Sequence, residues 1–275
     1  MDKLFLITGV SSGLGRALAL AALEAGHAVA GTVRGDEQAR AFAALRPGRA
    51  HPQLLDVTDG GAIDEVVTRV ERDIGPIAVL VNNAGYGHEG VLEESPLDEL
   101  RRQFEINVFG AVAMIKAVLP YMRPRRRGHI VNITSMGGSI TMPGIAYYCG
   151  SKFALEGISD TLSQELAPFG IAVTAVAPGS FRTDWAGRSM VRSARSIGDY
   201  DASFDPVRQA RIAKHGKQAG DPARAAQAIL RLVEHPAPPA HLLLGSDALA
   251  LVRQALGQRL ADIDAWEALT RSTDG

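Results

Sequence analysis

Short apolar segments alternate along the chain with longer segments in which apolar residues recur every three or four positions. The short segments are rich in β-branched residues and have no polar face, which is typical of strands buried on both sides of a parallel sheet. They are Leu4–Thr8, Ala28–Val33, Ala78–Val81, His129–Ile133 and Ala172–Ala177. The longer segments, with helical periodicity, include Leu14–Ala25, Ile63–Ile74 and Leu97–Met122. This alternation predicts a Rossmann-type α/β fold, in which a doubly wound parallel sheet lies between two layers of helices.

The alternation stops at about residue 186, where a polar, arginine-rich stretch runs to residue 217. Asp221-Pro222 then has the form of a helix N-cap followed by proline at the first helical position, and predicts a helix to about Val233. His241–Gly245 is a predicted last strand. The tail that follows has apolar residues on a single helix face, which must pack on the core or on another subunit. They are Leu249, Val252, Leu256, Leu260, Ile263 and Trp266.

Composition limits which binding partners and which cellular compartment we expect. The 275 residues are 46% hydrophobic, which suits one domain, and the formal charge of −1 gives no reason to expect nucleic acid or an anionic membrane as partner. No stretch reaches the ~18 consecutive apolar residues of a membrane span, and the N-terminus is too short for a signal peptide. The single cysteine, Cys149, excludes an intrachain disulfide. We therefore expect a cytoplasmic protein, without a metal site because no His, Cys or Asp cluster has ligand spacing.

A glycine-rich loop, "ITGVSSGLGRALA", links the first predicted strand to the first predicted helix. Glycine permits the tight turn and a close approach of the backbone, and a helix N-terminus offers free N–H groups to a phosphate. The loop therefore predicts dinucleotide binding. Its candidate cofactor residues are Gly9, Ser11, Ser12, Gly13, Leu14 and Gly15.

Two tyrosines precede a lysine in "YYCGSK", residues 147–152. Tyr148 and Lys152 are four apart and share a helix face, whereas Tyr147 is five residues from Lys152 and lies off that face. A nearby ammonium favours the phenolate and lowers the pKa of a tyrosine from about 10. Tyr148 is therefore the candidate general acid or base.

The TGxxxGxG loop together with YxxxK resembles the short-chain dehydrogenase/reductase family, from Leu4 to about Asp184. "NNAG" is present at residues 82–85, Asn107 lies in "FEINVFG", and Ser135 precedes Tyr148 by thirteen residues. "APGSFRTD" at residues 177–184 matches the proline–glycine motif of the family. The glycine spacing departs from the GxGxxG of the standard Rossmann fingerprint.

The resemblance implies a catalytic set of Asn107, Ser135, Tyr148 and Lys152. Ser135 would hold the substrate oxygen, Lys152 would also contact the nicotinamide ribose, and Asn107 would hold a water that links Lys152 to solvent. The resemblance also implies cofactor contacts outside the glycine loop. These are at Arg34, Asp56, Val57, Asn83, Ala84, Gly85, Tyr148, Lys152, Pro178, Gly179, Phe181 and Thr183.

The choice of dinucleotide depends on the end of the second predicted strand. Val33 stands where an NAD-preferring enzyme has an acid, and Arg34 follows it. A guanidinium suits the 2′-phosphate of NADP, so NADP(H) is the favoured cofactor. Asp36 lies close enough to keep NAD(H) possible.

By the same resemblance, residues 1–185 form the cofactor-binding and catalytic part of a single domain spanning 1–275. Residues 186–217 form a variable segment that covers the substrate, and residues 218–275 complete the fold. The arginines of the variable segment would either recognise an anionic substrate or form a solvated surface. Its apolar residues Met190, Ile197, Tyr200 and Phe204 would line a pocket or anchor the segment. His88 and Glu89 are loop residues to which the sequence gives no role.

The function predicted is hydride transfer between NADP(H) and a small secondary alcohol or carbonyl compound. An NAD-dependent alcohol dehydrogenase of the same family is the alternative among enzymes. A dinucleotide-binding sensor or scaffold without turnover is the alternative outside them. A homodimer or homotetramer is expected, built on the helices around Leu97–Met122 and Phe153–Phe169.

Overall fold

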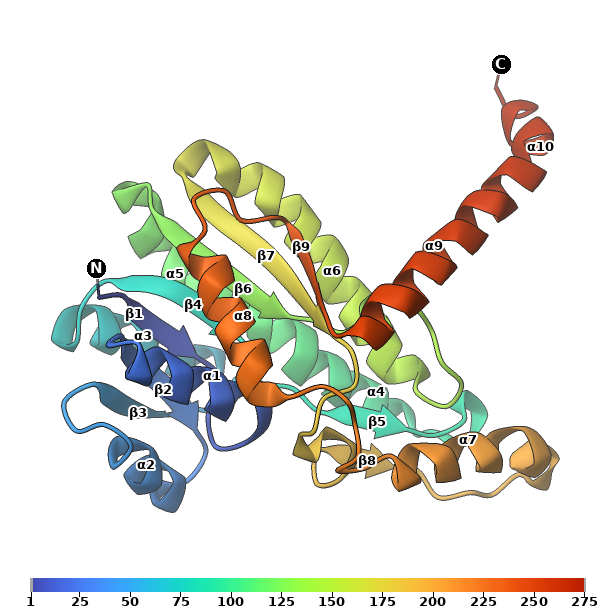
Figure 1. The fold of residues 1–275 in the computed structure, drawn as a ribbon, viewed down its shortest axis with the longest axis horizontal. Coiled ribbons are helices and arrows are strands. Elements are labelled where there is room, and N and C mark those ends of the chain that lie inside the picture. Colours follow the sequence, from blue (N-terminus) through green and yellow to red (C-terminus); the bar gives the residue numbers. More distant parts are fainter. Residues whose placement is uncertain (1, 275) are drawn as a thin grey trace.

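The computed structural model describes residues 2–274, which form a seven-stranded parallel sheet in the order β3-β2-β1-β4-β6-β7-β9 (Figure 1). The sheet strands are β1 (Leu4–Ile7), β2 (Ala28–Val33), β3 (Ala50–Leu54), β4 (Ile77–Asn82), β6 (Gly128–Ile133), β7 (Ile171–Pro178) and β9 (His241–Leu244). A separate parallel pair joins β5 (Gly87–Glu89) to β8 (Met190–Arg192). The helices are α1 (Gly13–Glu24), α2 (Asp36–Ala43), α3 (Gly60–Asp73), α4 (Leu97–Phe104), α5 (Gly110–Arg125), α6 (Ala146–Leu166), α7 (Asp201–Ala213), α8 (Pro222–Glu234), α9 (Ser246–Ala265) and α10 (Glu267–Arg271).

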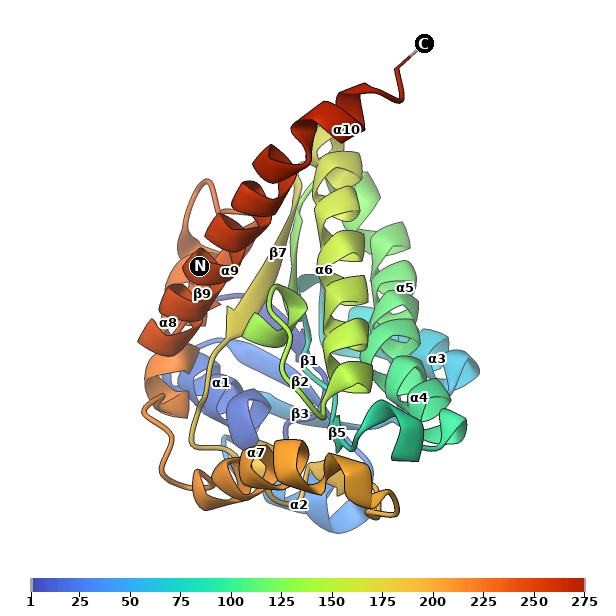
Figure 2. The ribbon, with the colours of Figure 1, turned by 90° about the vertical axis from the view of Figure 1, so that its right-hand side faces the viewer.

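Helices cover both faces of the sheet, so the predicted doubly wound three-layer fold is confirmed (Figure 2). On one face α1 and α8 pack together through side chains such as Leu18 and Ile229. On the other face α3 and α5 pack through side chains such as Val67 and Met114. Successive strand residues of β1 alternate between these two cores, as residues of a strand buried on both faces must.

The structure differs from the sequence prediction at β3 and at the helix that begins at Leu97. β3 was not predicted, because its sequence AHPQL has too few apolar residues to stand out as a strand. The single helix predicted over Leu97–Met122 is instead α4, a π-helical turn at Glu105–Phe109, and α5. By length and composition alone, Leu97–Arg125 is the one helical stretch among residues 2–274 that could cross a membrane. Of its apolar window 44% is buried inside the fold, and Met114, Val118 and Met122 belong to the core that α5 shares with α3.

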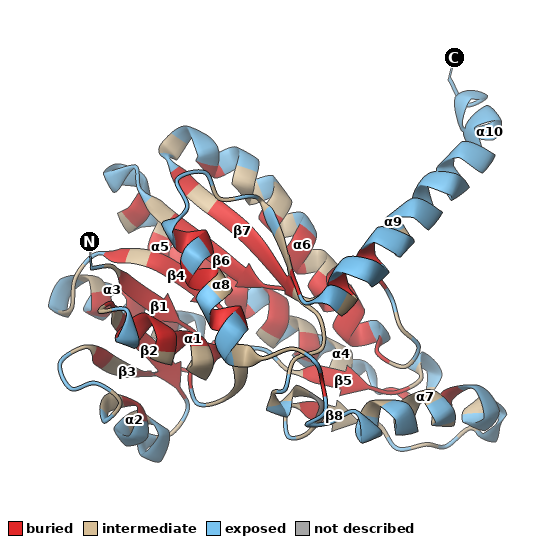
Figure 3. Ribbon diagram, in the orientation of Figure 1, coloured by how far each residue is buried: buried red, intermediate tan, exposed pale blue. Residues whose placement is uncertain are grey.

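The C-terminal arm, residues 246–271, consists of α9 and α10 and projects away from the sheet (Figure 1). Its first turns touch the body, where Val252 is buried. Beyond Ala255 the described residues of the arm are exposed (Figure 3), although Arg259 still donates to the carbonyl of Ser139 at 3.0 Å. The possibility that the tail stripe packs on the core of its own chain is therefore wrong for the stripe residues after Val252, because α9 leaves the sheet instead of folding back.

Candidate functional site

The glycine loop joins β1 to α1 at the carboxyl edge of the sheet. Gly9 and Gly13 have φ of 73° and 59°, a left-handed conformation that favours glycine. The side-chain amide of Asn83 holds the loop by donating to the carbonyls of Thr8 and Gly9, at 2.9 and 3.1 Å. Ser12 is the N-cap of α1 but makes no side-chain cap hydrogen bond, so the first-turn N–H groups are open to an anion. The loop therefore fits a dinucleotide pyrophosphate.

Gly15 has less space for a side chain than Gly9 or Gly13, and Gly15→Ala tests this constraint. A Cβ at Gly15 would lie 3.0 Å from Asn83 Cγ and closer still to Asn83 Nδ2 and Gly9 O. We expect the variant to lose about 1–3 kcal/mol of unfolding free energy and to bind dinucleotide more weakly, because the loop must shift. The control is Gly157→Ala on α6, where an added Cβ meets nothing within 4 Å. Urea unfolding and a dinucleotide titration measure both effects, and equal behaviour of the two variants would contradict the prediction.

The tyrosine and lysine predicted to share a helix face do so on α6. Lys152 Nζ lies 5.8 Å from the centre of the Tyr148 ring and donates to the carbonyl of Ile133 at 2.8 Å. Ser135, just after β6, lies beside Tyr148, since a Cβ at Gly137 would lie 3.3 Å from Ser135 Oγ and 3.4 Å from Tyr148 Cε1. Tyr147 points elsewhere and donates its hydroxyl to the carbonyl of Ser95 at 2.8 Å. The structure therefore brings Ser135, Tyr148 and Lys152 together and leaves Tyr147 out.

Asn107 lies in the π-helical turn, a feature that occurs often at functional sites. Its Oδ1 accepts from the N–H of Tyr86, and its Nδ2 donates to the carbonyl of Tyr86 and to Ser151 Oγ, each at 3.1 Å. A Cβ at Gly85 would lie 3.0 Å from Asn107 Oδ1 and 3.8 Å from Lys152 Nζ. Asn107 thus lies near the lysine, and its side chain links the backbone after β4 to Ser151 on α6.

The proline–glycine motif closes the site from the end of β7. Thr183 lies over the glycine loop, with its Cβ 3.7 Å from the position of a Cβ at Gly13. Pro178 ends β7, and Phe181 packs against the core beside α1. Asp247, in the first turn of α9, accepts the N–H of Ser180 at 2.8 Å. Asp247 therefore orders this loop, and no motif in the sequence pointed to it.

The residues predicted around the adenosine half are placed as follows. Val33 is buried, so this strand end offers no carboxylate, while the side chain of Arg34 is exposed beside it. Asp56 Oδ1 accepts from Thr58 N and Oγ1 in a local turn, at 3.0 and 2.8 Å. Val57 is buried against Gly110 at the start of α5. Ala84, after β4, donates its N–H to Thr8 Oγ1 at 2.9 Å.

Comparison with known proteins identifies the class of this site. The family model described as short chain dehydrogenase matches residues 3–192. The chain belongs to the short chain dehydrogenase family. A short-chain dehydrogenase structure from Streptomyces avermitilis is 42% identical, covers all of both chains and superposes with a TM-score of 0.93. A 3-ketodihydrosphingosine reductase from Bacteroides thetaiotaomicron is 37% identical over 88% of each chain.

The same comparisons bear on the cofactor. The structure of ElxO with NADP bound is 27% identical, covers 91% of this chain and all of that one, and has a TM-score of 0.75. This short chain dehydrogenase is therefore an oxidoreductase that acts on CH–OH or carbonyl groups with NAD(P), as the sequence predicted. Binding of NADP(H) is supported by that relative.

Burial sets the charge states in this short chain dehydrogenase. The pKa of Tyr148 is raised by burial, and the neighbouring Ser135 side chain opposes the rise only in part. The sequence predicted a Tyr148 pKa lowered by Lys152. The effect of burial on the Tyr148 pKa is larger than that of the lysine, because the Trp185 ring, 4.9 Å from the Tyr148 ring, helps to exclude water. Burial also lowers the pKa of Lys152 to about 8, against an opposing effect of Glu156.

The lowered pKa of Lys152 predicts a pH dependence of stability. Between about pH 8 and pH 10.5 the unfolded chain binds a proton at Lys152 that the folded chain does not, so this residue makes stability rise with pH. We expect it to add about 2 kcal/mol between pH 8 and 10 in the cofactor-free protein. The measurement is urea unfolding of the wild type and of Lys152→Met across this range. Parallel stability curves for the two proteins would refute the lowered pKa.

The segment after the proline–glycine motif is tied to the body by buried ion pairs. Glu89 has a fully buried carboxylate that accepts from Arg192 at 2.8 Å and from Arg211 at 2.7 Å. Glu94 likewise holds Arg195 at 2.8 Å. Glu89 is thus not the loop residue without a role that the sequence suggested, because β5 pairs with β8 and places it between two arginines. The surface interpretation of these three arginines is wrong for the same reason.

Apolar contacts anchor the same segment. Met190 is buried against Gly87, and Phe204 is buried against Gly144, where no Cβ would fit. His88 is also buried and hydrogen bonds to Ser193 Oγ at 2.9 Å. Met190 and Phe204 therefore anchor the segment, one of the two roles that the sequence left open.

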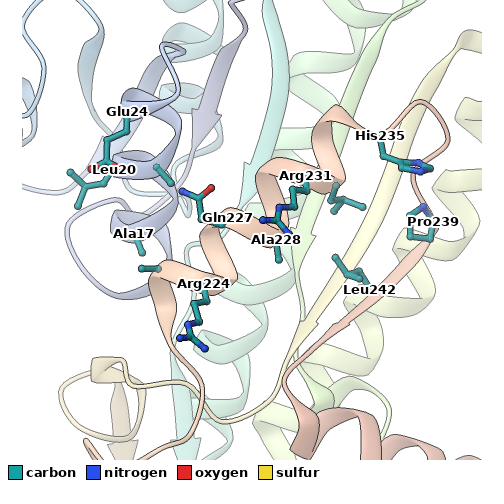
Figure 4. Close-up of a pocket in the computed structure, with 13 residues that line it drawn as sticks. Ala17, Leu20, Glu24, Arg224, Gln227, Ala228, Arg231, His235, Pro239 and Leu242 are labelled. Atoms are coloured by element: carbon teal, nitrogen blue, oxygen red, sulfur yellow. The ribbon is translucent and has the colours of Figure 1, made fainter.

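A groove of about 910 Å³ lies elsewhere, between α1, α8 and β9 (Figure 4). Its lining is mostly apolar, and Figure 4 shows Glu24, Arg224 and Arg231 around it. None of the predicted catalytic or cofactor residues lines it. The groove is therefore separate from the predicted catalytic and cofactor-binding residues of this short chain dehydrogenase.

Proposed function

We propose that this protein is an NADP(H)-dependent oxidoreductase that interconverts a small ketone and its secondary alcohol, with Tyr148 as the group that transfers the proton. The observation that carries the proposal is the cluster of three side chains at the carboxyl edge of the sheet. Ser135 Oγ lies beside the Tyr148 ring, and Lys152 Nζ lies 5.8 Å from the centre of that ring. A sensor or scaffold would have no use for such a proton-transfer cluster beside its cofactor site.

The chain would bind and orient both reactants. The open N–H groups of α1 and the left-handed glycines suit the pyrophosphate, and Thr183 lies above them. The bound dinucleotide supplies or accepts the hydride. In reduction, Ser135 holds the carbonyl oxygen and Tyr148 donates its hydroxyl proton to that oxygen as charge develops there.

The protonation state of Tyr148 in the resting enzyme suits proton donation. Burial keeps the hydroxyl of Tyr148 protonated, so a proton donor is already in place. Lys152 would stabilise the phenolate left after proton donation and then help to reprotonate it. The similarity to a 3-ketodihydrosphingosine reductase supports reduction of a ketone as the reaction class.

NADP(H) is the proposed cofactor because an exposed arginine, Arg34, follows a buried strand end that lacks a carboxylate. Titration with NADPH and NADH, followed by nicotinamide fluorescence, tests this. We expect NADPH to bind at least about tenfold more tightly, and Arg34→Gln to remove most of that preference by weakening NADPH alone. Arg40→Gln, at another exposed arginine on α2, is the control and should change neither affinity.

The other outcomes separate the alternatives. Equal or tighter binding of NADH would show that Arg34 does not read a phosphate, and would favour an NAD-dependent alcohol dehydrogenase. Tight dinucleotide binding without turnover of a panel of ketones and alcohols would favour a sensor. Failure to bind either dinucleotide would refute the proposed function.

A further inference from the structure

The C-terminal arm carries an apolar face that no residue among 2–274 covers. Leu256 is 49% exposed, Leu260 62%, Ile263 64% and Trp266 64%. Together with Leu249 and Leu269, these side chains leave roughly 600 Å² of apolar surface in water, approaching the ~800 Å² that each partner buries in a standard interface. Patches of this size mark interaction sites, and a helix that stands off its own body lacks the packing that keeps helices stable.

The charges beside this apolar face have a pattern of their own. Arg253 and Asp264 are eleven positions apart, which is three helical turns, so both lie on the same flank of the stripe. Neither forms an ion pair with any other described residue, although the structure gives partners to Arg259 and Asp262 nearby. The arm thus carries an unpaired cation, Arg253, near its N-terminal end and an unpaired anion, Asp264, near its C-terminal end.

We propose that the C-terminal arm binds the arm of a second copy of this chain, with the two helices antiparallel and crossing near Gln258. A two-fold axis at that point places Leu256 opposite the partner's Leu260. It also places Arg253 opposite the partner's Asp264, and the symmetry makes each of these contacts twice. One register therefore pairs the apolar face and both unpaired charges, which makes the arm complementary to itself.

The charges of the arm fit two other binding partners less well, namely the groove between α1 and α8 and a membrane surface. The groove between α1 and α8 has arginines at its rim and would suit the acidic tip of the arm, but it would leave Arg253 unpaired. A membrane surface favours helices whose polar face is rich in Lys and Arg. The polar face of this arm carries Asp262, Asp264 and Glu267 among its arginines, so an anionic bilayer would repel much of it.

Sedimentation of the full chain tests the apolar face. The wild type should sediment at twice the 29.1 kDa chain mass. Leu260→Glu should raise the dissociation constant at least about 100-fold, because it buries an unpaired charge in the interface. Leu92→Glu is the matched control, since Leu92, after β5, is 64% exposed and lies outside the arm. Unchanged circular dichroism and NADPH affinity show that each variant is folded.

A charge exchange tests the register. Arg253→Glu and Asp264→Arg should each weaken the dimer about tenfold by placing like charges opposite one another, and the double variant should restore the wild-type constant within about threefold. A monomeric wild type, or a dimer indifferent to Leu260→Glu, would overturn the proposal. So would a dimer weakened by Arg231→Glu in the groove but not by Arg253→Glu. Flotation of a monomer with phosphatidylserine vesicles would also overturn it, in favour of a membrane partner.

Discussion

Tyr148→Phe is expected to lower kcat for ketone reduction by about 10³-fold while leaving the affinity for NADPH within about twofold. The phenylalanine ring keeps the packing against Trp185 but removes the hydroxyl that would donate the proton. Loss of the proton donor therefore affects the chemical step and not the dinucleotide site. Steady-state kinetics and a fluorescence titration of the same preparation measure the two effects.

Tyr147→Phe is the matched control, because it removes a neighbouring hydroxyl that bonds to the carbonyl of Ser95. It should leave kcat within about threefold and lower stability by about 1 kcal/mol. If both variants kept wild-type turnover, the proposed role of Tyr148 would be wrong. If both lost NADPH binding, the substitutions would have disturbed the fold, and kinetics at saturating cofactor with a circular dichroism check would show it.

Glu89→Gln is expected to destabilise the protein by about 3 kcal/mol, the second large effect. The carboxylate of Glu89 is fully buried between Arg192 and Arg211, and an amide would leave both guanidinium groups without their charge partner. Because these arginines join β8 and α7 to the body, the segment from residue 186 to 217 should detach first. Limited proteolysis should then cut within this segment before any other part of the chain.

Asp98→Asn is the control for Glu89→Gln, since its ion pair with Arg101 is almost fully exposed. Exposed pairs of this kind contribute about 0–1 kcal/mol, so urea unfolding should barely change. A loss of stability as small for Glu89→Gln would show that its ion pairs do not anchor the segment.

The sequence predicted the sheet and the Tyr148–Lys152 pair because both depend on local periodicity. Buried parallel strands are continuous apolar runs, and a helix of known spacing puts residues four apart on one face. The break of the helix at Glu105–Phe109 could not be predicted, because the π-helical turn depends on Asn107 bonding to Tyr86 and Ser151, which lie in other segments.

The same limit applies to burial and charge. Nothing near Glu89 in the sequence shows that two arginines more than 100 residues later enclose it. The pKa of Tyr148 was predicted to fall because a lysine is near, but its direction follows from burial under Trp185, which only the fold reveals. The motif thus predicted which side chains lie together, but not whether water reaches Tyr148 or Glu89.

The packing of α8 on α1 has a consequence for synthesis of the chain. The apolar side of α1, with Leu18 and Ala22, is covered by α8 through Ile229. The helix that covers α1 is therefore synthesised long after α1 itself. Roughly 200 residues must be added between the two helices, which takes about 10–40 s at ordinary translation rates. During that time the side of α1 that later packs on α8 is exposed to water in the nascent chain. Apolar side chains in the first 25 residues therefore stay exposed to water until the residues of α8 emerge.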